Sequence, residues 1–195
     1  MLVRGEDTTG TTSPEIGYVL QKDLLLPWRT MLGNVVLGLE VRRTPKAEAH
    51  EKARALFAEY GMTGFEDRYP GEVSGGMRQR AALMRTMVLD PQVILMDEAY
   101  KALDYPLKIE LESELLRTVR EAGKAVVFVT HDIEEAVTLS DRVYVLEARP
   151  GRITDEIRVD LEVDSTRIEE RRLSPRFNDY YEQIWRGIGR PISTP

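Results

Sequence analysis

Three short apolar runs of the sequence each end in polar residues whose types suit catalysis. The runs end at Gln21, at the pair Asp97 and Glu98, and at His131. If the runs are neighbouring parallel strands, these side chains gather at one edge of the sheet, where open α/β sheets bind their ligands. Asp97 would ligate Mg²⁺, which takes only one or two protein carboxylates. Glu98 would polarise an attacking water, His131 would contact a γ-phosphate, and Gln21 would reach both metal and water, which together are the parts of nucleotide hydrolysis.

A second candidate site is the stretch VSGGMRQR at residues 73–80. The pair Gly75 and Gly76 follows Ser74 and precedes an amphipathic run, which indicates a helix that begins at bare glycines. The first N–H groups of a helix have no acceptor within it and favour an anion, and Ser74 adds a hydroxyl. A γ-phosphate fits such a position. An ordinary loop before a helix is the alternative that these residues leave open.

The elements that position these residues follow from hydrophobic periodicity. An uninterrupted apolar run predicts a strand over 93–96 that is buried on both faces, and a second buried strand follows over 125–131. A further strand is expected over 16–21. Helical spacing of apolar residues, with glycine or proline near the ends, predicts helices over 46–60, 74–89, 106–123 and 174–188. The stretch 30–89 shows no clear buried strand and is expected to form a helical insertion beside the sheet.

Local signals predict how several elements begin. Asp132 should cap a helix with Glu135 in the capping-box position, and Ser174 should cap the last helix with Pro175 in its first turn. Two strands should flank a turn at Pro150 and Gly151. Because buried strands alternate with amphipathic helices, the fold class is α/β with a largely parallel sheet.

Composition excludes several classes of protein. The chain has 195 residues, 42% of them hydrophobic and 31% charged, as in ordinary globular domains. A formal net charge of −6 argues against nucleic acid as a partner. There are no cysteines and only two histidines, so disulfides, thiolate zinc sites and histidine-rich metal sites are not expected. The absence of a long apolar run and of a signal-peptide pattern favours the cytoplasm.

Five motifs occur in a fixed order along nearly the whole chain. They are the Q-loop at Leu20 and Gln21, the signature VSGGMRQR, the Walker B run VILMDE, the D-loop at Ala102–Asp104 and the switch histidine in VTHD. In order and approximate spacing the chain resembles the ATP-binding cassette (ABC) ATPases. Finer features, including the segment LLLPWRT and the tail SPRFNDYYEQIW, resemble ATPase subunits of bacterial importers for nitrate, sulfonate and taurine.

The resemblance implies a composite site between two cassettes that face each other head to tail. Asp97 and Gln21 would hold Mg²⁺, Glu98 would be the general base and His131 the switch histidine. The signature residues Ser74, Gly75 and Gly76 would act in trans on the ATP of a second ABC ATPase subunit. Asp104 would couple the two sites.

The resemblance also implies a membrane permease as partner. The region after Gln21, which includes Leu26, Pro27 and Trp28, would cradle the permease's coupling helix. The protein would then be cytoplasmic and peripheral on the inner face of the plasma membrane.

The Walker A motif G-x-x-x-x-G-K-[ST] does not occur in these residues. It supplies the amide cradle and the lysine that hold phosphates, so we expect this chain alone to bind Mg-ATP weakly. The expected fold is a partial P-loop NTPase (RecA-like) parallel sheet with a helical signature subdomain, N-terminally truncated so that it lacks the first strands and the Walker A helix. Walker B continues Glu98-Ala99-Tyr100-Lys101, where this subgroup has Glu-Pro-Phe-Gly, and Lys101 puts a positive charge near the Mg²⁺ site.

We expect four regions: a core-sheet remnant with the Q-loop (1–29), the helical subdomain (30–89), the α/β core with Walker B, D-loop and switch histidine (90–160), and a helical tail (161–195). Two functions fit them. One is the ATP-hydrolysing subunit of an importer. The other is a non-catalytic module that donates its signature helix to a partner cassette or docks a permease. A cassette of DNA repair or chromosome organisation ranks lower, because those carry long coiled coils between Q-loop and signature.

Overall fold

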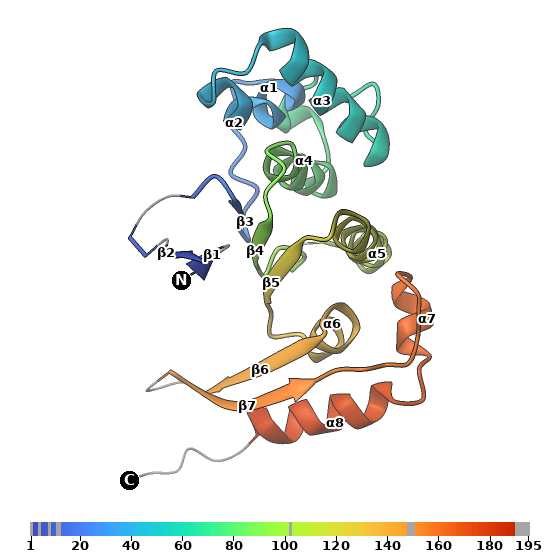
Figure 1. Cartoon of the computed structure of the whole chain (residues 1–195). Coiled ribbons are helices and arrows are strands. Elements are labelled where there is room, and N and C mark those ends of the chain that lie inside the picture. Colours follow the sequence, from blue (N-terminus) through green and yellow to red (C-terminus); the bar gives the residue numbers. More distant parts are fainter. Residues whose placement is uncertain are drawn as a thin grey trace. The chain divides into compact units, whose positions relative to one another are not determined.

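The computed structural model describes residues 2–3, 5–7, 9–10, 13–101, 103–147 and 151–189. Ala102 of the D-loop and Pro150 of the hairpin turn lie outside them. The chain forms two compact units. The first comprises residues 1–107 and 122–129, and the second comprises residues 108–121 and 130–195. Figure 1 shows helix α5 (Tyr105–Ala122). Its residues 108–121 belong to the second unit and its two ends to the first.

The first unit is built on a three-stranded parallel sheet. Its order is β3 (Ile16–Val19), β4 (Val93–Asp97) and β5 (Ala125–Val129). The register aligns Val19 with Met96, and Met96 with Phe128. The predicted α/β fold with neighbouring parallel strands is therefore confirmed. A separate antiparallel pair, β1 (Leu2–Val3) and β2 (Glu6–Asp7), precedes the sheet in the chain.

The prediction that the strands over 93–96 and 125–131 are buried on both faces was wrong. In β4 Ile94 and Met96 are buried, whereas the residues that alternate with them are only half-buried. In β5, Val127 and Val129 are each 54% exposed. Both valines lie on the face of the sheet that also carries the half-exposed Tyr18, so this face is incompletely covered, which an apolar run by itself does not reveal.

Helices fill the stretch 30–89, as predicted. They are α1 (Met31–Val35), α2 (Leu37–Val41), α3 (Lys46–Glu59), a short 3₁₀ turn (Pro70–Glu72) and α4 (Gly75–Met87). In Figure 1 they lie together on one side of the strands of their unit. Their apolar faces form the core of this unit through Val35, Phe57 and Met84, which have no exposed surface.

Helix α4 packs directly on β3. The Thr86 hydroxyl donates a hydrogen bond to the Tyr18 carbonyl (3.2 Å), and a Cβ on Gly17 would lie 2.5 Å from Thr86 Cγ2. Glycine at position 17 therefore allows this close approach of the signature helix to the sheet.

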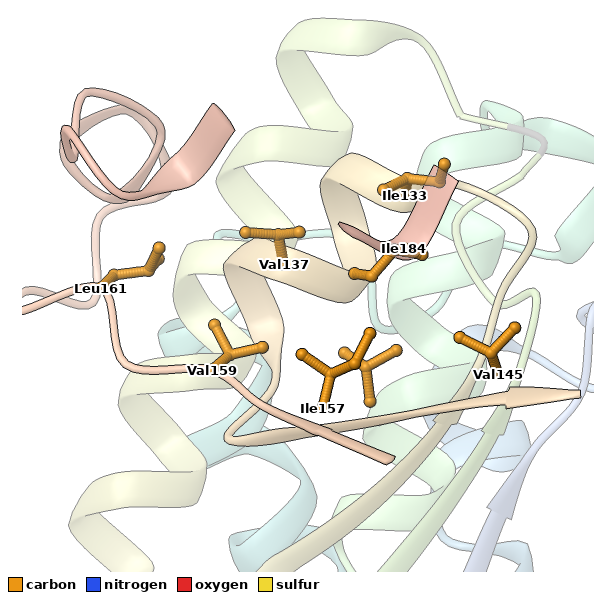
Figure 2. Packing of buried hydrophobic residues seen from close by; sticks show 8 residues of the cluster. Ile133, Val137, Val145, Ile157, Val159, Leu161 and Ile184 are labelled. Carbon is orange, nitrogen blue, oxygen red and sulfur yellow. The ribbon is translucent and has the colours of Figure 1, made fainter. Parts of the chain in front are cut away.

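The second unit holds an antiparallel hairpin with helices packed on it. Strands β6 (Arg142–Glu147) and β7 (Arg152–Arg158) pair as predicted, and α6 (Ile133–Leu139), α7 (Ile168–Arg172) and α8 (Phe177–Ile188) complete it. Figure 2 shows the core, where Val137 of α6 and Ile184 of α8 meet Val145 and Ile157 of the hairpin. Burial of these branched side chains stabilises the unit.

Of two predicted helix starts in this unit, the cap at Asp132 is confirmed without its capping box, and the cap at Ser174 was wrong. Asp132 caps α6 as expected, but its own N–H bonds to the Thr130 hydroxyl (3.0 Å), and the Glu135 carboxylate pairs with Lys108 (2.6 Å) instead of closing a capping box. Ser174 does not cap α8, which begins at Phe177. Its hydroxyl donates to the Leu161 carbonyl (2.7 Å), a buried acceptor that the sequence gives no sign of.

Candidate functional site

Gln21 and Glu98 meet at the carboxyl end of the sheet. Gln21 lies two residues beyond β3, and Glu98 directly follows β4. Since β3 and β4 are parallel neighbours, these ends coincide, and Gln21 Nε2 donates a hydrogen bond to Glu98 Oε2 (2.9 Å). The two residues are 77 positions apart in the sequence.

Glu98 is held in an uncommon conformation. Its φ angle is +45°, in the left-handed region that non-glycine residues seldom adopt. Its N–H donates to the Val129 carbonyl (2.9 Å), which ties the turn to β5. Backbone strain of this kind concentrates at functional sites.

Lys101 also binds the Glu98 carboxylate. Its Nζ lies 2.9 Å from Oε2, the same oxygen that accepts from Gln21. The positive charge expected near the Mg²⁺ site, that of Lys101, therefore lies directly against the Glu98 carboxylate. The side chains of Glu98 and Lys101 are 26% and 49% exposed, so this ion pair is open to water and to rearrangement.

Asp97 and Gln21 offer oxygen atoms suited to Mg²⁺. Asp97 is the last residue of β4 and is half-buried. Gln21 commits its amide nitrogen to Glu98, which leaves its amide oxygen as a potential ligand. Within the described ranges no group of three or more His, Cys, Asp or Glu side chains is arranged to hold a metal. Carboxylate and amide oxygens in small number fit Mg²⁺, which keeps several waters.

The signature stretch begins helix α4. Ser74 is the N-cap, and its Oγ accepts a hydrogen bond from the Met77 N–H (3.3 Å). The N–H groups of Gly75 and Gly76 in the first turn have no acceptor within the helix. Ser74 and Gly75 are exposed. This end of the helix is a polar, positively polarised surface.

The two glycines of the signature differ in surroundings. A Cβ on Gly75 would meet its nearest atom, Arg78 Nη2, at an ordinary 3.6 Å. A Cβ on Gly76 would lie 2.1 Å from Leu107 Cδ2. An alanine at position 76 would therefore displace the end of the Leu107 side chain, a contact that the sequence gives no sign of.

Helix α4 is tied to both neighbouring motifs. The buried Gln79 donates from Nε2 to the Ala99 carbonyl (2.6 Å), next to Glu98. Arg78 Nε bonds to the Asp23 carboxylate (3.1 Å), and Arg85 donates to the carbonyls of Asp23 (2.7 Å) and Leu24 (2.9 Å). Burial lowers the pKa of Arg85, and the charge of Asp23 partly opposes this. The sequence did not predict these arginine contacts, because no local pattern identifies the partner of an arginine side chain.

The remaining predicted site residues lie in different environments. Asp104 Oδ1 accepts a hydrogen bond from the Leu107 N–H (3.2 Å), as a cap of α5 does. Trp28 and Leu24, after the Q-loop glutamine, are 72% and 53% exposed. His131 follows β5 by two residues, is exposed, and belongs to the second unit.

Comparison with known proteins identifies the family. The family model described as ABC transporter matches residues 2–101, just over half of the 195 residues. The chain belongs to the ABC transporter ATP-binding family. An ABC transporter ATP-binding protein of Methanocaldococcus jannaschii, itself uncharacterized, is 47% identical over 171 residues, which cover 87% of this chain and 64% of that protein. The taurine import ATP-binding protein of Pseudomonas putida is 42% identical over 146 residues, which cover 75% of this chain and 56% of that protein.

Solved structures show the ABC fold as well. A cassette solved as a dimer in a post-hydrolysis state, bound to ADP and Pi, superposes with a TM-score of 0.66 at 30% identity and covers 75% of this chain and 63% of that one. This ABC chain thus spans less than two thirds of the length of each of these relatives. In the part that the structure describes, no helix has the length and apolarity needed to cross a membrane.

Proposed function

We propose that the chain is the ATP-binding and ATP-hydrolysing subunit of a bacterial ABC importer. The observation that carries the proposal is the hydrogen bond of 2.9 Å between Gln21 and Glu98, which joins the ends of adjacent parallel strands beside Asp97. It supports the proposal because the Gln21 amide meets the Glu98 carboxylate next to Asp97, and nucleotide hydrolysis uses a general base and a metal-binding carboxylate close together.

In this proposal Asp97 and Gln21 hold Mg²⁺ on the phosphates. Mg²⁺, when bound, neutralises phosphate charge. Glu98 accepts a proton from the attacking water, which requires that Lys101 release or share the carboxylate. His131 orients that water and contacts the γ-phosphate.

The other half of the proposed site belongs to a second cassette subunit. Ser74, Gly75 and Gly76 bind the partner's γ-phosphate through a hydroxyl and the helix N-terminus. Asp104 couples the two sites. The proposal also includes the division of the chain into four regions, which are 1–29, 30–89, 90–160 and 161–195.

The proposed permease contact is the segment after Gln21. Leu24 and Trp28 are exposed there, on a loop that Arg85 fixes to the signature helix. The protein would therefore act at the cytoplasmic face of the membrane. The likeness to a taurine import protein supports a small sulfonate, nitrate or similar solute as cargo.

The test is complementation in trans. The chain is mixed with the full-length taurine import ATP-binding protein of Pseudomonas putida whose own signature motif has been inactivated, and ATP hydrolysis is measured. We expect the chain to restore hydrolysis through Ser74. Ser74→Gly should abolish the restored rate, because glycine keeps the helix start at a cost of only a few tenths of a kcal/mol but removes the hydroxyl.

Two controls sharpen the test. Gly71→Ala, in open space three residues before the cap, should leave the restored rate unchanged. Glu98→Gln should also leave it within about twofold, because Glu98 would serve the other nucleotide, whereas loss of a general base costs about 10²–10⁴-fold at its own site. No restoration by the parent chain, or equal restoration by Ser74→Gly, contradicts the proposed action of the signature motif on the partner's ATP.

A further inference from the structure

A buried ionic cluster in the second unit joins helix α5 to Asp132, the last residue of the VTHD motif, and to Glu135 of helix α6. Its centre is Lys108 of α5, whose Nζ lies 2.7 Å from Asp132 Oδ2 and 2.6 Å from Glu135 Oε1. The side chains of Lys108 and Glu135 are 15% and 5% exposed. With Glu112 these residues form what we call the Lys108 cluster. Buried pairs of this quality are strongly coupled, since removing one partner leaves a charge uncompensated.

The cluster anchors both neighbours of His131. On one side, the Asp132 carboxylate binds Lys108 through Oδ2 and caps α6 through Oδ1, which accepts the Glu134 N–H (2.9 Å). On the other side, the Thr130 hydroxyl donates to Glu135 and accepts the Asp132 N–H (3.0 Å). The backbone that carries the exposed His131 is therefore fixed at residues 130 and 132.

Glu112 completes the cluster as an uncharged member. It has no exposed surface, and neither of its carboxyl oxygens has a hydrogen-bond partner. Burial raises the pKa of Glu112 to about 8, and Lys108, 3.8 Å away, offsets this only in part. Because Glu112 is neutral, the positive charge of Lys108 is balanced by the carboxylates of Asp132 and Glu135. The other charges near it are paired, because Arg172 of α7 binds Glu134 (3.1 Å).

We propose that Lys108 is a positioning residue that holds the segment 130–132, and with it His131, in a single conformation. The inference rests on the proposed function, in which His131 acts on the nucleotide. For Asp132, burial would raise the pKa, but the hydrogen bond and charge of Lys108 hold it below its ordinary value. Asp132 is thus an anion committed to Lys108, which gives the segment one stable arrangement.

The experiment uses the ring resonances of the two histidines in NMR spectra of the whole chain. His131→Gln assigns the signals, and His50 of α3 is the internal reference. Lys108→Met removes the charge and keeps an aliphatic chain of similar length. We expect the His131 signals to move by more than a line width and to broaden, while those of His50 stay in place. Lys108→Arg, which keeps a cation, should restore most of the original spectrum.

A matched control and a second variant keep the test decisive. Lys52→Met removes an exposed lysine that pairs with Glu48 on a helix surface (2.7 Å) and should move neither histidine. Thr130→Val removes the hydroxyl anchor without changing charge, and it decides the matter if Lys108→Met unfolds the chain. His131 signals that stay unchanged in Thr130→Val and in any folded Lys108→Met protein overturn the positioning role.

The spectra, taken together with rates of ATP hydrolysis, separate this inference from the proposed function. If the His131 signals move as expected but His131→Ala leaves ATP hydrolysis by the assembled transporter unchanged, the positioning role stands and the proposed catalytic role of His131 fails. If hydrolysis falls in His131→Ala and in Lys108→Met alike, with KM for ATP changed less than kcat, both stand.

Discussion

At the scale of single residues, Glu98 and Glu112 show how different environments suit two glutamates to different roles. Glu98 accepts hydrogen bonds from Gln21 and Lys101 at the sheet edge and remains in reach of solvent. Glu112 is fully buried on α5 with unsatisfied oxygens, so its neutral form is favoured. The first environment suits a base that must meet water, and the second suits a structural group that titrates near neutrality.

Glu112 makes stability depend on pH in a predictable direction. Its pKa is about 8 in the folded chain and 4.5 as an ordinary value, so between these limits the unfolded chain releases a proton that the folded chain keeps. Stability should therefore fall as pH rises from about 4.5 to about 8. Glu112→Gln should reduce the fall in unfolding free energy between pH 5 and pH 8.5 by roughly 2–4 kcal/mol, since each pKa unit is worth about 1.4 kcal/mol.

Urea unfolding at a series of pH values measures this effect. Glu110→Gln, on an exposed position of the same helix, is the matched control and should leave the pH dependence as it is. A pH profile identical in Glu112→Gln and the parent chain would contradict the assignment.

At the scale of elements, the signature helix α4 is held by contacts along its whole length. Gly76 meets Leu107, Gln79 meets the Ala99 carbonyl, and Thr86 meets β3. The start of the helix, where a phosphate is proposed to bind, is therefore positioned by packing more than by its own sequence. Stable placement of a helix N-terminus is what an anion site requires.

Replacing Gly76 with alanine should strain this packing. The new Cβ would lie 2.1 Å from Leu107 Cδ2, the end of a flexible side chain, so we expect a loss of about 1 kcal/mol in unfolding free energy, because the helix propensity of alanine offsets part of the strain. Gly75→Ala, with its nearest atom at 3.6 Å, should change it far less. The double variant Gly76→Ala with Leu107→Ala should show smaller than additive loss, because it removes the clash. Denaturant titration of the parent chain, the single variants Gly76→Ala, Gly75→Ala and Leu107→Ala, and the double variant decides between packing and a purely electrostatic need for glycine.

At the scale of the whole molecule, one face of the parallel sheet carries exposed apolar side chains. Tyr18, Leu95 and Val127 form a row across the three strands, and Val129 lies on the same face. Tyr18 is 50% exposed and the two valines 54% each. An apolar face beside an exposed edge strand favours association with other chains.

We predict that this face drives self-association of the isolated chain at micromolar concentrations. The double variant Val127→Thr and Val129→Thr keeps β propensity but adds hydroxyls, and should shift sedimentation velocity profiles toward the monomer. Val41→Thr, on a residue that is 78% exposed in α2, should have no such effect. A parent chain that sediments as a monomer throughout would refute the prediction.

The sequence predicted what neighbours along the chain decide. The periodicity of Ala53 and Phe57 predicted α3, Ser74 and its glycines predicted the start of α4, and short apolar runs predicted the parallel strands. Helix caps and hydrophobic patterns are local interactions, so the residue types suffice to recognise them. The candidate chemistry at Gln21, Asp97 and Glu98 was recognisable for the same reason, through motifs of fixed order.

Only the tertiary structure decided which distant side chains meet. Lys108 lies 24 positions from Asp132, and Arg85 lies 62 from Asp23, and no local pattern records either contact. The exposure of Val127 depends on which face of the sheet is left uncovered, and Glu135 pairs with Lys108 because both are buried together. Such contacts follow from how elements pack, where burial and charge balance select among many partners that the sequence alone leaves equivalent.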